Sequence, residues 1–114
     1  MSDRVLVVDA GSVLSPADKF SPGRIIIRNG RVDAVGLLSD VRPPDGADHI
    51  DALRLTVVPG FIDPHIHGSG GADVMDATFV SMNTISRTLA SHGTTSFLPT
   101  TVSAPPEILG STLD

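Results

Sequence analysis

The stretch PGFIDPHIHGSGG, residues 59–71, decides the fold that we expect for this chain. Its apolar run, interrupted at Asp63, His65 and His67, predicts a strand over residues 61–67, and the glycines after it predict a loop. Alternate side chains of a strand share a face, so these three polar side chains should project together. Parallel α/β proteins place their chemistry where such a strand meets its loop.

The sequence after this strand predicts a helix and a second strand. Apolar residues at helical spacing favour a helix over residues 79–92, with Asp76 or Thr78 as its cap. The apolar stripe consists of Met82, Ile85 and Leu89. A β-rich segment follows at residues 94–102, and a second helix is expected to start near Ser103. A β-α-β order requires a parallel sheet covered by helices, so we expect this chain to be the front part of a longer α/β protein.

The first half of the chain predicts a small all-β module. Asn29-Gly30 is a dipeptide preferred in two-residue hairpin turns, and it indicates a hairpin between strands at residues 24–28 and 31–36. The other expected elements are a strand at residues 4–8, a turn at 9–11, a polar loop at 39–48 and a strand at 55–58.

Composition and charge narrow the class of protein. The 114 residues include 13 Asp and Glu against 8 Lys and Arg, a formal net charge of −5, and no cysteine. These values are typical of a globular protein and exclude a disulfide framework or a thiolate metal site. The negative charge argues against nucleic acid as a partner, and no apolar run is long enough for a signal peptide or a membrane span. We expect a soluble, cytoplasmic protein with neither a nucleic-acid nor a membrane partner.

His65 and His67 are the candidate metal ligands. Same-face Cα atoms of a strand lie about 6.6 Å apart, so two imidazoles at this spacing can converge on one divalent ion. A His-x-His pattern also arises by chance, but its place on an apolar strand before a glycine-rich loop favours ligation. Zinc is the metal that we expect, although iron and other divalent metals accept the same nitrogen and oxygen donors.

Three other features have structural interpretations beside chemical ones. Gly68, Gly70 and Gly71 could cradle a phosphate, but the pattern is weak, and an active-site loop that moves is the favoured interpretation. His92 ends the predicted helix, where a cation interacts favourably with the helix dipole, so a structural role is favoured. His49 lies in a polar loop segment and is expected at the surface.

Several stretches resemble a known family. PGFIDPHIHG resembles the first barrel strand of the amidohydrolase superfamily. HIHGSGGADVMDAT and SHGTTSFLPTTVSAP resemble the N-acetylglucosamine-6-phosphate deacetylases, and IIIRNGRVDAVG resembles the N-terminal sandwich strands of the same enzymes. The resemblance implies an α/β fold in which residues 1–57 are strands of a small β-sandwich. Residues 58–114 would then be the first β-α-β unit of a (β/α)8 TIM-type barrel, which is incomplete in this chain.

The resemblance also implies a function for the full-length protein and roles for individual residues. It implies a metal-dependent hydrolase that converts the amino-sugar phosphate N-acetylglucosamine 6-phosphate to glucosamine 6-phosphate and acetate. A homodimer is possible for the full-length enzyme. His65 and His67 would be metal ligands, and Asp63 would support them or belong to the barrel core. Pro64 departs from a regular strand because it has no N–H for the ladder. Some deacetylases lack the histidine pair and hold one metal, so the pair makes a second metal possible here.

The remaining parts of the family's site have no counterpart in this sequence. The later Glu and His ligands, the catalytic Asp and the phosphate-binding residues are expected beyond residue 114, so we expect no catalytic residue in this chain. Two alternatives stay open. One is another amidohydrolase, dihydroorotase-like or deaminase-like. The other is a truncated, non-catalytic module that acts by association with a partner.

Overall fold

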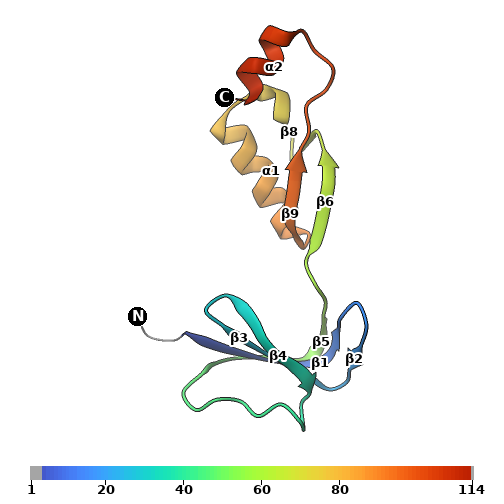
Figure 1. Ribbon diagram of the computed structural model, residues 1–114, viewed down its shortest axis with the longest axis vertical. Helices are drawn as coiled ribbons and strands as arrows, with labels where there is room; N and C mark the ends of the chain where they lie inside the picture. The colour runs from blue at the N-terminus through green and yellow to red at the C-terminus, as the bar shows by residue number, and fades with distance from the viewer. Residues whose placement is uncertain (1–3, 114) are drawn as a thin grey trace. The chain divides into compact units, whose positions relative to one another are not determined.

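The structure, a computed structural model, describes residues 4–113 and forms two compact units (Figure 1). The first unit ends at Pro59 and the second begins at Gly60. We call residues 4–59 the β module and residues 60–113 the βαβ unit, and each is described by itself. Strands dominate, and two α-helices lie in the βαβ unit. The assignment of the two parts to a sandwich, residues 1–57, and a barrel, residues 58–114, stays a prediction.

One five-stranded sheet makes up the β module. Its strands are β1 (Val5–Leu14), β2 (Lys19–Phe20), β3 (Gly23–Arg28), β4 (Arg31–Leu37) and β5 (Asp48–Val57). β1 is antiparallel to β2 and β3 and parallel to β5, and β4 extends the sheet beyond β3. The described residues of this module contain no second, facing sheet, so the sandwich is not seen within them.

The hairpin predicted from Asn29-Gly30 is confirmed. β3 and β4 pair antiparallel with Arg28 opposite Arg31, which leaves two residues for the turn. The backbone φ is 51° at Asn29 and 78° at Gly30, so both turn residues adopt the left-handed conformation that a type I′ turn requires. Glycine and asparagine reach this conformation at the lowest steric cost, which is why the dipeptide predicts the turn.

Two strands are longer than the sequence predicts. β1 continues through residues 9–11, where a turn is expected, and β5 begins at Asp48, at the end of the expected polar loop. A Cβ at Gly11 would collide with the carbonyl oxygen of Leu53, so glycine here permits a close approach of β1 to β5 and not a turn. The prediction that His49 lies in a loop is also wrong, because it lies on β5.

Aliphatic residues and one ion pair form the interior of the β module. The buried apolar residues are Val7, Ala10, Val13, Ile26 and Ala52. Asp9 is buried among them. Its Oδ2 accepts a hydrogen bond from Nη2 of Arg24 at 2.7 Å, and its Oδ1 accepts a second hydrogen bond from Nε of the same guanidinium. Arg24 also donates to the carbonyl of Val41 at 2.8 Å, which ties the connection between β4 and β5 to the sheet. Pairing of this kind offsets the cost of burying two charges.

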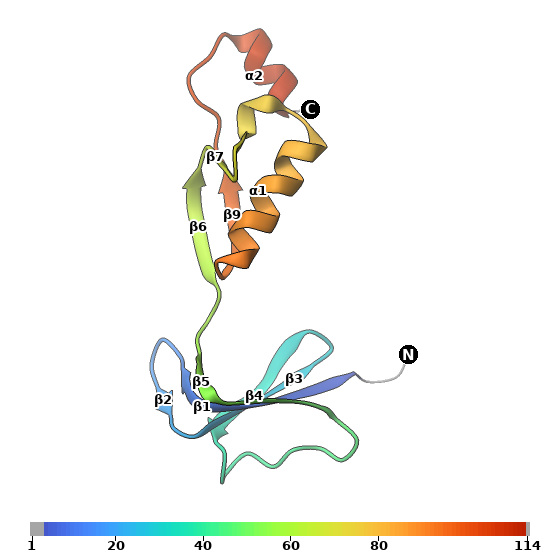
Figure 2. The ribbon, with the colours of Figure 1, turned by 180° about the vertical axis from the view of Figure 1, so that it is seen from behind.

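The βαβ unit contains the predicted β-α-β order. β6 (Phe61–Ile66) and β9 (Thr94–Pro99) are parallel neighbours, and α1 (Phe79–Ser91) runs beside β9 (Figure 2). The other elements are β7 (Gly68–Ser69), β8 (Ala72–Asp73), the 3-10 helix η1 (Val74–Asp76) and α2 (Pro106–Leu113). β9 ends three residues earlier than the predicted limit of 102. The barrel itself stays a prediction, and among residues 4–113 no helix has the length and apolar character needed to cross a membrane.

Side chains and glycine set the ends of α1. Thr78 caps the helix, because its side chain accepts a hydrogen bond from the N–H of Ser81 at 3.1 Å. Asp76, the alternative cap, instead accepts from the N–H of Asp73 in the capping box of η1. Gly93 follows the helix at φ 87°. Of the predicted stripe, Ile85 is fully buried and Met82 and Leu89 are partly buried.

The glycine-rich segment is a tight hairpin, where the sequence predicts a loop. β7 and β8 pair antiparallel around Gly70-Gly71, whose φ values are 65° and 83°. A Cβ at Gly70 would collide with the hydroxyl of Thr88 on α1, so glycine allows the hairpin to pack against the helix. In the chain, the hairpin lies between β6 and η1, and backbone pairing of β7 with β8 holds it together.

Candidate metal centre

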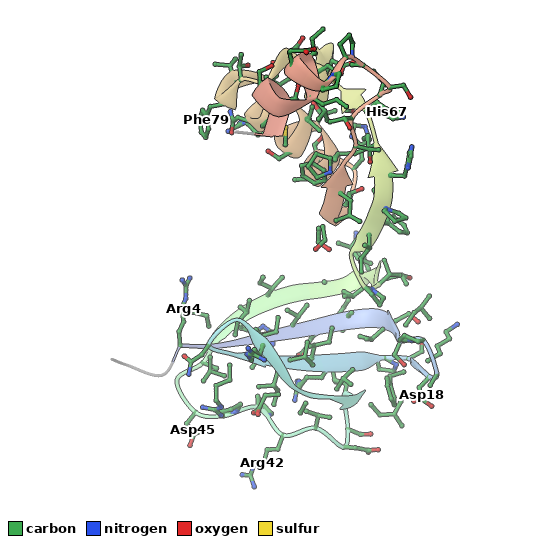
Figure 3. The ribbon with its side chains drawn as sticks, turned by 45° about the horizontal axis from the view of Figure 1, so that its top comes forward. Arg4, Asp18, Arg42, Asp45, His67 and Phe79 are labelled. Atoms are coloured by element: carbon green, nitrogen blue, oxygen red, sulfur yellow. The ribbon has the colours of Figure 1, made fainter. Side chains whose placement is uncertain are left out.

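The two predicted ligands meet at the carboxyl end of β6. His65 lies on the strand. His67, which is labelled in Figure 3, follows the last residue of the strand. The Nε2 atoms of the two imidazoles are 3.2 Å apart, and the rings meet edge to face with centroids 4.8 Å apart. Both side chains are exposed in the described structure. The two imidazoles therefore lie close together in the structure, and their role as metal ligands stays a prediction.

The separation of the Nε2 atoms suits a shared metal ion. With metal–nitrogen bonds of about 2.0–2.1 Å, nitrogens at this spacing subtend an angle of about 100° at the ion, close to tetrahedral. The same spacing also permits a hydrogen bond from one imidazole to the other. The pair thus has the donor type and spacing for zinc or a similar divalent ion.

A backbone carbonyl fixes the proton of His67. Nδ1 of His67 lies 2.8 Å from the carbonyl oxygen of Thr100, directly after β9. A carbonyl oxygen only accepts, so Nδ1 carries the proton and Nε2 of the neutral ring keeps its lone pair. The N–H of Val74 donates to the carbonyl of His67 at 2.7 Å and holds its backbone as well. Metal-ligating histidines are commonly oriented by such a contact at the second nitrogen.

Asp63 does not gather with the histidine side chains as the strand alternation predicts. Its Oδ1 accepts a hydrogen bond from the backbone N–H of His65 at 3.1 Å. Within the described range 4–113, no cluster of three or more His, Asp, Glu or Cys side chains has the geometry to hold a metal ion. In the structure, therefore, the side chains of His65 and His67 form a pair, whereas the carboxylate of Asp63 contacts the backbone N–H of His65.

The remaining candidates lie away from this pair or keep structural contacts. Gly68, Gly70 and Gly71 belong to the β7–β8 hairpin, and their role as an active-site loop is a prediction. His92 caps the end of α1, where its Nδ1 lies 2.8 Å from the carbonyl of Thr88, in line with the structural interpretation. A cavity of about 360 Å³ opens beside α1 and α2, and its lining does not include His65 or His67.

Sequence reasoning missed two sets of contacts. The carbonyl of Thr100 carries no side-chain signal, so nothing in the sequence reveals it as the partner of His67. Nor does the sequence reveal that Asp9 pairs with Arg24 and lies 2.9 Å from Nε2 of His49. The hydrogen bond from Arg24 holds the pKa of the Asp9 carboxyl below its ordinary value against the opposing effect of burial, and His49 acts in the same direction.

Comparison with known proteins identifies the family. The Amidohydrolase family description matches residues 56–111. An N-acetylglucosamine-6-phosphate deacetylase from Vibrio furnissii is 51% identical over 77 residues, which cover 65% of this chain and 19% of the relative. The chain belongs to the amidohydrolase family. Its described elements align with the N-terminal part of the deacetylases, as the sequence resemblance predicts.

Two solved structures of an N-acetyl-D-glucosamine-6-phosphate deacetylase from Mycobacterium smegmatis extend this amidohydrolase match. One is 34% identical with a TM-score of 0.80, covering 96% of this chain and 30% of that chain. The second is a mutant in complex with N-acetyl-D-glucosamine-6-phosphate, 36% identical with a TM-score of 0.71, covering 99% and 28%. This chain therefore spans roughly a fifth to a third of the length of the relatives that it matches.

Proposed function

We propose that this chain supplies the first histidine pair of a metal-dependent deacetylase acting on N-acetylglucosamine 6-phosphate. The products would be glucosamine 6-phosphate and acetate. In this proposal the β module contributes strands to a small β-sandwich, and the βαβ unit begins a (β/α)8 barrel. The single observation that carries the proposal is the pair of Nε2 atoms, 3.2 Å apart at the carboxyl end of β6.

The position of the pair supports this function. In barrels of this class the chemistry lies at the carboxyl ends of the strands, and His65 and His67 lie at that end of β6, beside Thr100 after β9. The similarity to deacetylase structures covers 96% and 99% of the chain. The mutant deacetylase crystallised with its amino-sugar phosphate supports a substrate of that class.

The residues of this chain bind and orient, and they do not complete the reaction. His65 and His67 would hold a divalent ion, with zinc as the first choice and iron as an alternative. When bound, such an ion supplies Lewis acidity, which polarises an amide carbonyl and acidifies water. Thr100 keeps the His67 proton on Nδ1, so that Nε2 is the donor atom. A general base and the sugar and phosphate contacts would come from residues other than these.

A binding measurement on the chain tests the ligand assignment. Titration of Zn²⁺ into the purified chain should show a site that is lost in His65→Ala and in His67→Ala, because each removes one nitrogen donor. His92→Ala is the matched control and should leave the site unchanged, since its ring contacts the α1 backbone. Equal Zn²⁺ binding by wild type and both variants would show that the assignment is wrong.

A chimera tests the reaction. The 114 residues would replace the matching N-terminal segment of the Mycobacterium smegmatis deacetylase, to which they are 34% identical. We expect metal-dependent release of acetate from N-acetylglucosamine 6-phosphate, and its loss in the chimera carrying His65→Ala and His67→Ala together. A folded chimera that binds metal through the pair but leaves this substrate intact would contradict the proposed activity.

A further inference from the structure

β6 contains an irregularity at the point where it presents the first histidine. In its pairing with β9, Asp63 lies opposite Phe97 and Ile66 lies opposite Pro99, so three steps along β6 match two along β9. The register gives no partner on β9 to the two residues between them, Pro64 and His65. A bulge of this kind bends a strand and changes the direction of a side chain, and bulges are frequent beside functional sites.

The bulge leaves backbone groups that need a partner. Pro64 has no N–H to donate, so the donor in this interval is the N–H of His65. Oδ1 of Asp63 accepts that N–H at 3.1 Å. The carboxylate thus substitutes for the ladder hydrogen bond and closes a ring between residues 63 and 65.

The same contact bears on the direction of the His65 imidazole. The ring of His67 is fixed independently, because its Nδ1 is held by the carbonyl of Thr100. Among residues 4–113 the Nδ1 of His65 has no hydrogen-bond partner, so the direction of this ring depends on its own backbone and on His67. A change in the bulge would move His65 relative to a fixed His67.

We propose that Asp63 is a positioning residue for the metal pair, through its hydrogen bond to the N–H of His65 and not through contact with an ion. This role of Asp63 rests on the proposed function in one respect, namely that His65 and His67 are the metal ligands. Loss of the acceptor lets the bulge relax, and the two Nε2 atoms then no longer meet at the spacing that a metal ion needs.

The chain contains a matched control for this device. Oδ1 of Asp51 accepts the N–H of Leu53 at 3.0 Å, again two residues along a strand and again where the register of that strand shifts. Asp51 lies on β5 in the β module, whereas the histidine pair lies in the βαβ unit. Asp51→Ala therefore removes an equivalent hydrogen bond without touching the proposed mechanism.

The test compares four proteins by Zn²⁺ titration and by the visible spectrum of Co²⁺. We expect Asp63→Ala to weaken the apparent affinity about tenfold or more, the range typical for residues that orient ligands. Asp63→Asn should stay within about twofold of wild type, because its amide oxygen can accept the same N–H. Asp51→Ala should match wild type. Equal affinity of Asp63→Ala and wild type would overturn the proposal, and so would an equal loss in Asp63→Asn and Asp63→Ala.

A second measurement keeps the proposal testable if Asp63→Ala fails to fold. Amide hydrogen exchange of His65 should be slowed in the wild-type chain and in Asp63→Asn, because the N–H is held in both. Exchange of the His65 amide in wild type at the rate of an unprotected peptide would overturn the proposal. This readout needs no metal. Failure of wild type to bind Zn²⁺ would therefore count against the proposed function, whereas an unprotected His65 amide would count against the role of Asp63.

Discussion

Single aspartates perform different tasks in this chain according to what surrounds their carboxylates. Asp9 is buried and neutralises Arg24, whereas Asp63 and Asp51 each accept one backbone N–H two residues along their own strand. Asp76 accepts from the N–H of Asp73, and this bond, with a further one from the Ser81 hydroxyl, lowers the pKa of its carboxyl. The chain has twelve aspartates and one glutamate, which suits such local contacts because the short side chain reaches nearby amides.

At the residue scale, the turn of the first hairpin provides a test of backbone conformation. Gly30 has φ 78°, and a Cβ there would meet no atom within 4 Å, so the cost of a side chain lies in the backbone alone. Gly30→Val should destabilise the chain by about 1–3 kcal/mol, measured by denaturant unfolding. Gly110→Ala is the control, since Gly110 lies in α2 with equally open space and without positive φ. Equal stability of Gly30→Val and wild type would refute the type I′ turn.

The buried ion pair predicts a dependence of stability on pH. The pKa of Asp9 is lowered in the folded state, so its stabilising effect is complete above its ordinary value of 3.8 and is lost as the pH falls through the folded pKa. Asp9→Asn should cost about 3 kcal/mol or more at neutral pH, because it leaves Arg24 without its partner charge. The difference from wild type should narrow below about pH 4, as measured by unfolding at a series of pH values.

A second ion pair serves as the control for Asp9. The Arg28–Asp33 pair spans 3.4 Å, and its side chains are 37% and 48% exposed, against 12% and 10% for Arg24 and Asp9. Asp33→Asn should therefore change stability by less than about 1 kcal/mol. Losses of similar size in the two variants would show that burial does not set the strength of the Asp9 pair.

At the element scale, the sequence predicts an element well where a local signal is sufficient. The Asn29-Gly30 turn and the Thr78 cap depend on residues within the turn or within three positions, and both are found. β5 is different, because the first half of this strand is rich in polar residues and its formation depends on pairing with β1, which is distant in the sequence. His49 faces Asp9 across the sheet, a contact 40 residues apart in the sequence that no local pattern can reveal. The His65–His67 pair was predictable from strand alternation, but the bulge that redirects Asp63 to the backbone was not.

The packing of α1 gives a prediction for the second unit. Ile85 is fully buried, whereas Val80 on the same helix is 73% exposed. Ile85→Ala should cost about 2–5 kcal/mol, and it should loosen the contact of the helix with its neighbours. Val80→Ala should change stability little, because its side chain contributes little burial. Thermal unfolding of both variants checks this expectation, and similar values for the two would contradict the packing described here.

At the scale of the whole molecule, the exposed apolar residues of the βαβ unit predict association. Phe61, Ile62, Phe79, Val80 and Leu98 are each more than 60% exposed, and β6 and β9 form a sheet of two parallel strands. Parallel sheets are normally covered on both faces, and open strand edges pair with other chains. The chain on its own should therefore associate at micromolar concentration. Light scattering checks this, and replacement of Phe61 and Ile62 by Ser should reduce it if the strand surface is responsible.

The donor set predicts that the 114-residue chain, assayed alone, does not deacetylate N-acetylglucosamine 6-phosphate. Catalytic zinc sites usually have three protein ligands and an open position. The part of the chain that the structure describes brings two imidazoles together, and the carboxylate of Asp63 accepts a hydrogen bond from the backbone N–H of His65. Two nitrogens hold an ion weakly, and among residues 4–113 no third His, Cys, Asp or Glu side chain completes a metal-binding group with them. Acetate release should stay at the background rate with added Zn²⁺, for wild type and for His65→Ala alike. Turnover abolished by a chelator and by His65→Ala would instead require a complete site, formed within this chain or between copies of it.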